Sequence, residues 1–199
     1  MTVIMDKKHL DIKRQRPCAL WLTGFSGAGK STIASLTERE LLSLGYRTYL
    51  LDGDIVRKSL CKDLGFSPAD RNENIRRIGA VAKLFTDAGF IVLVATISPF
   101  QQMRSNIRAL FSPGEFIEIF IDAPLAVCEQ RDPKGLYRRA RAGEISDFTG
   151  IHSAYDPPQT PELHLCTHQN SPEICTASIM AYLYQHEYLS DERQSQNRD

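Results

Sequence analysis

Residues 18–32 of the chain read CALWLTGFSGAGKST, an apolar run followed by a glycine-rich turn that ends in Lys30, Ser31 and Thr32. Residues 24–31 match the pattern G-x-x-x-x-G-K-[ST], between an expected strand and an expected helix. Glycines allow backbone N–H groups to close around phosphate oxygens, and the start of a helix adds partial positive charge. A lysine at this place reaches the terminal phosphates, and the next hydroxyl is a ligand for Mg²⁺. The stretch predicts a site for a nucleoside triphosphate with Mg²⁺.

The residues expected to hold this nucleotide are Gly24, Phe25, Ser26, Gly27, Ala28, Gly29, Lys30, Ser31 and Thr32. An alternative is a glycine-rich turn with an exposed lysine and no ligand. The position of the motif between a strand and an amphipathic helix favours the nucleotide site.

The rest of the chain continues the alternation of apolar strands and amphipathic helices. We expect strands at residues 18–23, 47–52, 90–97, 115–121 and 163–167, and helices at residues 31–44, 67–89, 100–111, 124–131, 134–142 and 171–188. The run FIVLVATI at 90–97 is nearly all apolar, which is typical of a strand buried on both faces of a parallel sheet. Because strands separated by helices need crossover connections, the pattern predicts an α/β fold. Its five-stranded parallel sheet is expected to lie between helical layers.

Composition narrows the class of protein. The 199 residues carry 24 Lys and Arg against 24 Asp and Glu, so a nucleic-acid or acidic membrane partner is not expected. The length predicts one domain, residues 18–188, between a basic tail at 1–17 and a polar tail at 189–199. The longest apolar run is too short to cross a bilayer. Five cysteines without zinc-site spacing, and a start without an apolar signal segment, predict a cytoplasmic protein.

Asp52-Gly53-Asp54 places two carboxylates where the second expected strand ends. The ligand crevice of an α/β sheet lies at the carboxyl ends of its strands. One carboxylate there can hold Mg²⁺-bound water, and the other can orient or deprotonate a hydroxyl acceptor. The chain has no N-K-x-D motif, which argues against a GTPase switch. The alternative is an ordinary turn in which Asp54 caps the next helix.

Basic and aromatic residues gather in the expected loops and helix starts. Arg57 follows the carboxylates by one helical turn, and Arg71 and Asn74 share a face at the start of the next helix. Further cations expected on this side are Arg76, Arg77, Lys134, Arg138, Arg139 and Arg141. This distribution predicts a second anionic substrate and a closing Arg/Lys-rich lid. Phe66 and Phe148 are candidates for stacking on a base, or else ordinary loop anchors.

Five blocks of the sequence also carry a resemblance. They are GFSGAGKST (24–32), LDGDIVR (51–57), LGFSPADRNENIRR (64–77), ISPFQQMR (97–104) and DPKGLYRRARAGEISDF (132–148). In this order they resemble the adenosine 5′-phosphosulfate (adenylyl-sulfate) kinase family, over roughly residues 15–188. The later blocks are the specific ones, since a shikimate or gluconate kinase shares only the phosphate-binding loop.

The resemblance implies a P-loop kinase fold and a reaction. The γ-phosphoryl group of Mg-ATP would pass to the ribose 3′-hydroxyl of adenylyl sulfate (APS), giving 3′-phosphoadenylyl sulfate (PAPS) and ADP. It implies catalytic roles for Lys30, Asp52, Asp54 and Ser98, with Ser31 and Asp52 at the metal. Implied substrate contacts are Asp52, Asp54, Arg57, Phe66, Arg71, Asn74, Ile97, Ser98, Pro99, Phe100, Lys134, Leu136 and Phe148. Lys134 and Leu136 would belong to the lid, and the enzyme would be a homodimer of sulfate assimilation.

Three positions qualify this expectation. The family's phosphoserine falls on Ser98, but in-line transfer to a positioned hydroxyl needs no protein nucleophile, so a positional role for Ser98 is an equal hypothesis. Ile55 stands where the family usually has Asn, and Met103 where an acidic residue is common. Two alternative functions remain: a P-loop kinase for a different small hydroxyl acceptor, and a module that binds adenylyl nucleotides without turnover.

Overall fold

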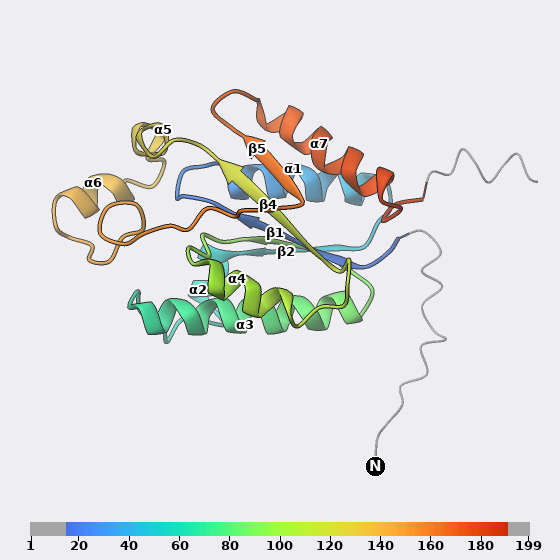
Figure 1. Cartoon of the computed structure of the whole chain (residues 1–199), viewed down its shortest axis with the longest axis horizontal. Helices are drawn as coiled ribbons and strands as arrows, with labels where there is room; N and C mark the ends of the chain where they lie inside the picture. Colours follow the sequence, from blue (N-terminus) through green and yellow to red (C-terminus); the bar gives the residue numbers. More distant parts are fainter. Residues whose placement is uncertain (1–14, 191–199) are drawn as a thin grey trace, which may run out of the picture.

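The computed structural model describes residues 15–190, which form a sheet covered by helices on both faces (Figure 1). The strands are β1 (Cys18–Thr23), β2 (Thr48–Asp52), β3 (Ile91–Ala95), β4 (Phe116–Asp122) and β5 (Leu163–Cys166). Within these residues the strands run parallel in the order β2-β3-β1-β4-β5. The α/β class and the five-stranded parallel sheet expected from the sequence are confirmed.

The helices form two layers. They are α1 (Lys30–Ser43), α2 (Gly53–Lys58), α3 (Pro68–Asp87), α4 (Gln101–Arg108), α5 (Leu125–Arg131), α6 (Leu136–Arg141) and α7 (Pro172–Gln185). Helices α1 and α7 cover one face of the sheet, and α2, α3 and α4 lie on the other (Figure 1). Helix α6 lies beyond the end of the sheet, with α5 leading into it. Within residues 15–190, every helix is too short or too polar to span a membrane.

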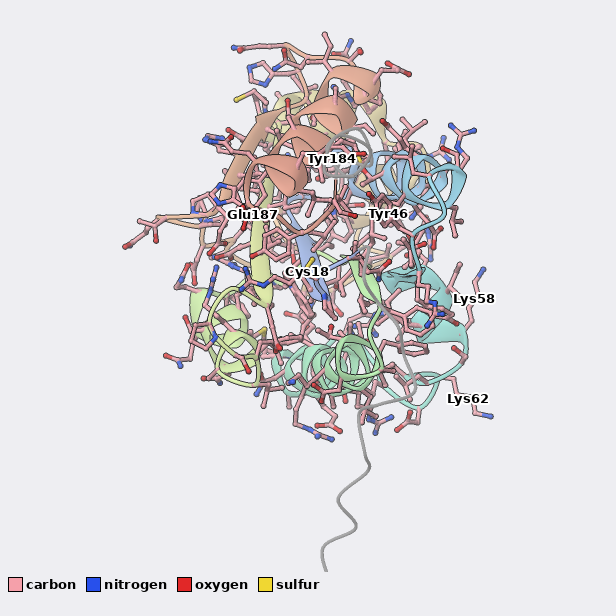
Figure 2. The ribbon with its side chains drawn as sticks, turned by 90° about the vertical axis from the view of Figure 1, so that its right-hand side faces the viewer. Cys18, Tyr46, Lys58, Lys62, Tyr184 and Glu187 are labelled. Atoms are coloured by element: carbon pink, nitrogen blue, oxygen red, sulfur yellow. The ribbon has the colours of Figure 1, made fainter. Side chains whose placement is uncertain are left out.

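Strand β1 shows why the sequence reads as a continuous apolar run. Cys18, Leu20 and Leu22 pack on the face with α1 and α7, whereas Ala19 and Trp21 pack on the face with α3 and α4. Figure 2 shows Cys18 inside, between the two layers, while Lys58 and Lys62 point outward. A strand buried on both faces has no position for an exposed polar side chain, and this strand therefore lies at the centre of the sheet.

Helix starts follow the sequence signals, with one correction. Ser67 accepts a hydrogen bond from the backbone N–H of Asp70, and Pro68 opens α3, as expected. A helix that was not among the expected elements, α2, begins at Gly53 directly after β2. Its cap is Asp52, which accepts from the N–H of Asp54 at 2.9 Å, so the alternative in which Asp54 is the cap is wrong.

Several elements are shorter than expected, because loops and caps take up their ends. The strand expected at 90–97 ends at Ala95, and residues 96–99 leave the sheet toward α4. Helix α4 covers 101–108 rather than 100–111, and α7 covers 172–185 rather than 171–188.

The domain also includes parts of both expected tails. Gln15 forms an antiparallel bridge with Leu189. Its buried side chain donates to the carbonyl of Gly89 at 2.7 Å and accepts from the N–H of Arg47 at 2.7 Å. Residues 1–14 and 191–199 of the expected tails lie outside the described residues.

Candidate active site

A cavity of about 1130 Å³ opens at the carboxyl ends of the central strands, where the sequence placed the crevice. It is lined by the nucleotide loop, by the ends of β2 and β3, and by residues of α3 and of the segment containing α6. Every residue of the expected nucleotide set and of the implied substrate contacts lines it except Gly24, Phe25 and Phe100. One cavity therefore brings together most residues of the nucleotide and substrate sets.

The nucleotide loop is shaped by backbone contacts. Gly24 has φ +147°, and a Cβ there would lie 2.2 Å from the carbonyl oxygen of Ile121. Gly27 has φ +76°, and its Cβ would lie 2.9 Å from the carbonyl oxygen of Cys128. Only glycine fits such positions, so Gly24 and Gly27 are required by the close approach of β4 and α5 as well as by the expected phosphate contacts. Phe25, expected on the nucleotide, packs on Tyr155 with ring centroids 4.9 Å apart.

Lys30 is buried at the base of the loop. Its Nζ donates to the carbonyl oxygens of Gly24 at 2.9 Å and Phe25 at 2.7 Å, so these two residues contact the cavity-lining lysine without lining the cavity themselves. The pKa of Lys30 is lowered to about 8, chiefly by burial and also by the positive charge of Lys134, while Cys128, Asp54 and Asp52 act in the opposite direction. A bound polyphosphate would favour the charged form of this amine.

The two carboxylates have different partners. Asp52 accepts from the hydroxyl of Ser31 at 2.5 Å and is thereby tied to the nucleotide loop. Asp54 forms an ion pair with Lys134 from the loop before α6, and both side chains are about half exposed. The two carboxylates therefore have separate surroundings: Asp52 contacts the nucleotide loop, and Asp54 contacts the expected lid.

Arg71 and Arg57 lie on the side of the cavity where the acceptor substrate is expected. The buried guanidinium of Arg71 donates to the carbonyls of Phe66 at 2.9 Å and Asp147 at 2.6 Å. Burial lowers the pKa of Arg71, with a further lowering by the charge of Arg57. Arg57 lies over the ring of Phe66, 4.4 Å from its centroid. Asn74 is buried in the cavity wall, and its Oδ1 has no hydrogen-bond partner within residues 15–190.

The two candidate stacking residues differ in exposure. Phe66 is 53% exposed at the cavity wall, whereas Phe148 is 6% exposed and packs edge-on against Tyr137 at 5.0 Å. Phe66 is therefore accessible at the cavity wall, with the guanidinium of Arg57 over its ring, and Phe148 is both a cavity-wall residue and part of the core. Phe100 packs against the core on the side of α4 and does not line the cavity.

Fewer cations face the cavity than expected. Arg57, Arg71, Arg131, Lys134 and Arg139 line it, whereas Arg76, Arg77, Arg138 and Arg141 do not. Three of the four cations outside the cavity wall form ion pairs with carboxylates: Arg76 with Glu73, Arg77 with Glu73 and Asp63, and Arg141 with Glu129. These surface ion pairs turn the side chains away from the cavity.

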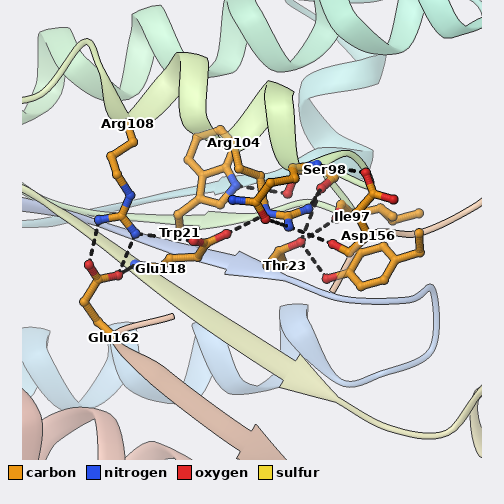
Figure 3. Close-up of polar contacts among 11 residues, drawn as sticks. Trp21, Thr23, Ile97, Ser98, Arg104, Arg108, Glu118, Asp156 and Glu162 are labelled. Carbon is orange, nitrogen blue, oxygen red and sulfur yellow. Dashed lines mark hydrogen bonds and ion pairs between the residues drawn. The ribbon is translucent and has the colours of Figure 1, made fainter. Parts of the chain in front are cut away.

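The loop that carries Ser98 is held by a buried network (Figure 3). Ser98 is 1% exposed, has φ 38°, and its hydroxyl accepts from Trp21 Nε1 at 3.0 Å. Arg104 donates to the carbonyl of Ser98 at 2.8 Å and to Glu118 Oε1 at 2.6 Å. Thr23 donates to the carbonyl of Ile97 at 2.7 Å. A strained φ at a buried serine costs about 1–3 kcal/mol and persists only where surrounding contacts fix it.

Sequence reasoning missed this network and several residues of the cavity wall, among them Thr167. A signal for the network was present in β4, where Glu118 interrupts an apolar strand and therefore requires a buried partner. Thr167 lines the cavity directly after β5, and its hydroxyl donates to the carbonyl of Ala28 at 2.7 Å. Its position at a strand's carboxyl end is the signal that would have found it.

Comparison with known proteins agrees with this geometry. The model of the family described as adenylylsulphate kinase matches residues 16–166. The adenylyl-sulfate kinase of Marinobacter nauticus is 58% identical over 177 residues, which cover 89% of each chain. That of Aeromonas hydrophila is 62% identical over 162 residues, covering 81% of this chain and 82% of the relative.

A solved structure gives the same assignment. The Mycobacterium tuberculosis APS kinase in complex with AMPPNP and APS is 47% identical. It superimposes with a TM-score of 0.82 over 85% of this chain and 99% of its own. Sequence, fold and cavity agree, and this chain belongs to the adenylylsulphate kinase family.

Proposed function

We propose that this chain transfers the γ-phosphoryl group of Mg-ATP to the ribose 3′-hydroxyl of adenylyl sulfate, forming PAPS and ADP in sulfate activation. The observation that carries the proposal is a single cavity joining the nucleotide loop to Asp52, Asp54, Asn74 and Phe66. Relatives at 54–62% identity are named adenylyl-sulfate kinases. The related M. tuberculosis structure is described with an ATP analogue and APS.

On the donor side, the loop from Ser26 to Thr32 surrounds the phosphates with backbone N–H groups, and Lys30 contributes charge. The oxygens of Ser31 and Asp52 lie 2.5 Å apart, and oxygen donors of this kind fit Mg²⁺, directly or through water. When bound, Mg²⁺ neutralises charge on the phosphate oxygens. To bind the phosphates, Lys30 Nζ would exchange its hydrogen bonds to the carbonyl oxygens of Gly24 and Phe25 for contacts with phosphate oxygens.

On the acceptor side, we assign Asp54 to orient the 3′-hydroxyl and take its proton. Lys134, now paired with Asp54, would move to the transferring phosphate as the expected lid closes. Asn74 Oδ1, without a partner within residues 15–190, is available to a ribose hydroxyl. Arg57 and Arg71 supply positive charge toward the phosphosulfate, and Phe66 and Phe148 flank the adenine. Ile97, Pro99 and Leu136 line the remaining wall.

Ser98 is assigned a positional role. Its hydroxyl is buried and accepts a hydrogen bond from Trp21 Nε1, a contact that fixes the side chain in the wall of the cavity. Transfer straight to a positioned hydroxyl needs no protein carrier of the phosphoryl group. What Ser98 contributes is the course of the main chain between β3 and α4.

The deciding test is steady-state assay with ATP, Mg²⁺ and adenylyl sulfate, comparing wild type with Asp54→Asn. Loss of a general base lowers turnover by about 10²–10⁴-fold. The affinity for AMPPNP should stay within a few fold, because the ion-pair partner of Asp54 is Lys134 and not a residue of the nucleotide loop. Asp87→Asn, a matched change on the exposed end of α3, should leave turnover unchanged. Full activity in Asp54→Asn would refute the assigned role.

A panel of small hydroxyl acceptors tests the alternative substrate class. The sequence argument for it was Ile55, and Ile55 is exposed and does not line the cavity. We therefore expect adenylyl sulfate to be the preferred acceptor. Turnover of another acceptor in its place, or nucleotide binding without any turnover, would reject the proposal.

Three finer features complete the proposal. The segment around α6, with Lys134 and Leu136, acts as a lid. The protein works in the cytoplasm, consistent with five cysteines that form no disulfide within residues 15–190. It forms a homodimer, as the family resemblance implies, and light scattering coupled to size-exclusion chromatography tests this.

A further inference from the structure

Three potential metal ligands converge on one side of the sheet, outside the cavity. Asp122 ends β4, and His164 and Cys166 lie on β5. His164 Nε2 is 2.8 Å from Asp122 Oδ2 and 3.8 Å from Cys166 Sγ. The three ligand atoms all lie within 4.8 Å of one another, and none of the three residues lines the cavity described above.

The parallel register of β4 and β5 produces this convergence. Asp122 pairs with Cys166, and Phe120 pairs with His164. Paired residues of neighbouring strands point to the same side, and residues two apart on one strand share a face. The ring of Phe120 stacks on His164 with centroids 5.0 Å apart, which limits rotation of the imidazole. The ligands therefore stand on hydrogen-bonded strands rather than on a loop, a favourable basis for a preorganised site.

We propose that Asp122, His164 and Cys166 bind a borderline-soft divalent metal ion of the Zn²⁺ type, with water as the fourth ligand. Zn²⁺ takes thiolate sulfur at about 2.3 Å and imidazole nitrogen or carboxylate oxygen at about 2.0–2.2 Å, in a tetrahedron. A tetrahedral edge between sulfur and nitrogen is then about 3.6 Å, close to the 3.8 Å between Cys166 and His164. The distance between His164 Nε2 and Asp122 Oδ2 needs to increase by about half an ångström to match the nitrogen–oxygen edge of the same tetrahedron.

The donor set decides which ion binds. A thiolate and an imidazole favour Zn²⁺ or Co²⁺ and disfavour Mg²⁺, which prefers oxygen. The ion that accompanies ATP therefore does not compete for this cluster. The side chain of His164 is 51% exposed and that of Asp122 is a third exposed, so water has access to complete the tetrahedron. Three protein ligands with an open position also permit exchange with solvent.

Without a metal, the same residues make surface contacts in which His164 Nε2 lies 2.8 Å from Asp122 Oδ2 and 3.8 Å from Cys166 Sγ. The His164–Asp122 contact does not need the thiol of Cys166, whereas the proposed metal site depends on that thiol. Cys166 is also the one cysteine of the described chain that is not buried. Whether Cys166 contributes to Zn²⁺ binding therefore distinguishes a metal site from a metal-free surface contact.

The test uses the full, untagged chain, stripped with chelator and titrated with Zn²⁺ against a chromophoric chelator, and with Co²⁺ by absorption spectroscopy. We expect one equivalent to bind, with a thiolate-to-cobalt charge-transfer band. Cys166→Ser should abolish the band and weaken Zn²⁺ binding by about tenfold or more, and His164→Ala should weaken it similarly. His186→Ala, at an exposed histidine on the end of α7, should leave both signals unchanged.

Kinase turnover in Mg²⁺ without Zn²⁺ serves as the folding control, and Cys166→Ser should match wild type there. The proposal is overturned if wild type binds no Zn²⁺ beyond the level of Cys166→Ser, or if the charge-transfer band survives in that variant. It is equally overturned if His186→Ala loses binding as His164→Ala does.

Discussion

Replacing Arg104 with Met removes the central cation of the network that holds Ser98, while keeping a long apolar stem. Arg104 is 1% exposed and donates to Glu118, Ser98, Gln101 and Asp156 at 2.6–2.8 Å. Removal leaves Glu118, itself buried, with Arg108 at 3.3 Å as its one remaining ion-pair partner within residues 15–190. In the variant, the negative charge of the buried Glu118 carboxylate is therefore only partly balanced by a neighbouring cation.

The size of the loss follows from the buried charge rather than from counting hydrogen bonds. Hydrogen bonds to charged groups contribute about 1.5–3 kcal/mol each, but those of one guanidinium share a single desolvation cost and do not add. Removing one partner of a buried pair costs about 3–5 kcal/mol. Since Arg108 remains near Glu118, we expect a loss of about 3 kcal/mol. Against a total of about 5–15 kcal/mol, the protein stays folded with a reduced margin.

Urea unfolding of four proteins measures this: wild type, Arg104→Met, Arg104→Met/Glu118→Gln and Arg108→Met. The double variant should be more stable than Arg104→Met, because it has no uncompensated carboxylate. Arg108 is 37% exposed, and its loss should cost only about 1 kcal/mol. The value of kcat/KM for adenylyl sulfate should fall in Arg104→Met, since the main chain at Ser98 loses a donor.

Two results would refute the reasoning. One is a cost for Arg104→Met no greater than that for Arg108→Met. The other is a double variant no more stable than the single one, which would mean that the charge on Glu118 is not what the guanidinium compensates.

Three further predictions concern single positions. Ser98→Ala should keep turnover within about tenfold of wild type while losing about 1–3 kcal/mol of unfolding free energy, since Trp21 Nε1 is left without its acceptor; turnover lower by several orders of magnitude would restore the phosphoserine intermediate. Because Lys30 has a pKa of about 8 and bound phosphates raise it, AMPPNP binding should take up protons above pH 8, and affinity should fall by up to about tenfold per pH unit there. Calorimetry at about pH 8.5 in buffers of different ionisation enthalpy measures the uptake, and Lys30→Arg, which does not titrate, should show none; equal uptake in both proteins would contradict the assignment. Gly79→Ala places a Cβ 2.5 Å from Ile107 Cδ1, so urea unfolding should show a loss of about 1–3 kcal/mol despite the better helix former. Ile107→Val in the same chain should recover part of that loss, and a stabilising Gly79→Ala would show that α3 and α4 are not tightly packed there.

The sequence predicts most of this fold because its signals are local. The strand–loop–helix at residues 18–32, the run at 90–97 and the cap at Ser67 each depend on neighbours a few positions away. Helix α2 was missed because it is short and begins in a segment that also reads as a turn. Its cap, Asp52, serves the helix and the nucleotide loop at once, and a local pattern does not indicate such double use.

Membership of the cavity was predictable, but side-chain direction was not. Arg77 lies on the expected segment, yet Glu73 and Asp63 draw its guanidinium away from the cavity. Ser98 was expected from the motif, whereas its partner Trp21 lies 77 positions away and reaches it only through the order of strands. The contacts of Ser98 and of the Asp122–Cys166 pair depend on which strands are neighbours in the sheet. Such contacts produce no characteristic residue spacing that could be recognised in the sequence.

Gly24 and Gly27 press against main-chain oxygens of β4 and α5, and this has a consequence for how the family can vary. The nucleotide loop takes its shape from the main-chain path of residues 116–128. Because the contacts are with main-chain oxygens, the side chains at residues 121 and 128 can vary without changing them. Insertion or deletion of one residue in residues 116–128 would change that path and deform the loop, even with every motif residue intact. Recombination between relatives should therefore tolerate crossover points that keep residues 18–32 and 116–128 from one parent. Splitting these two segments between parents of different length should not be tolerated.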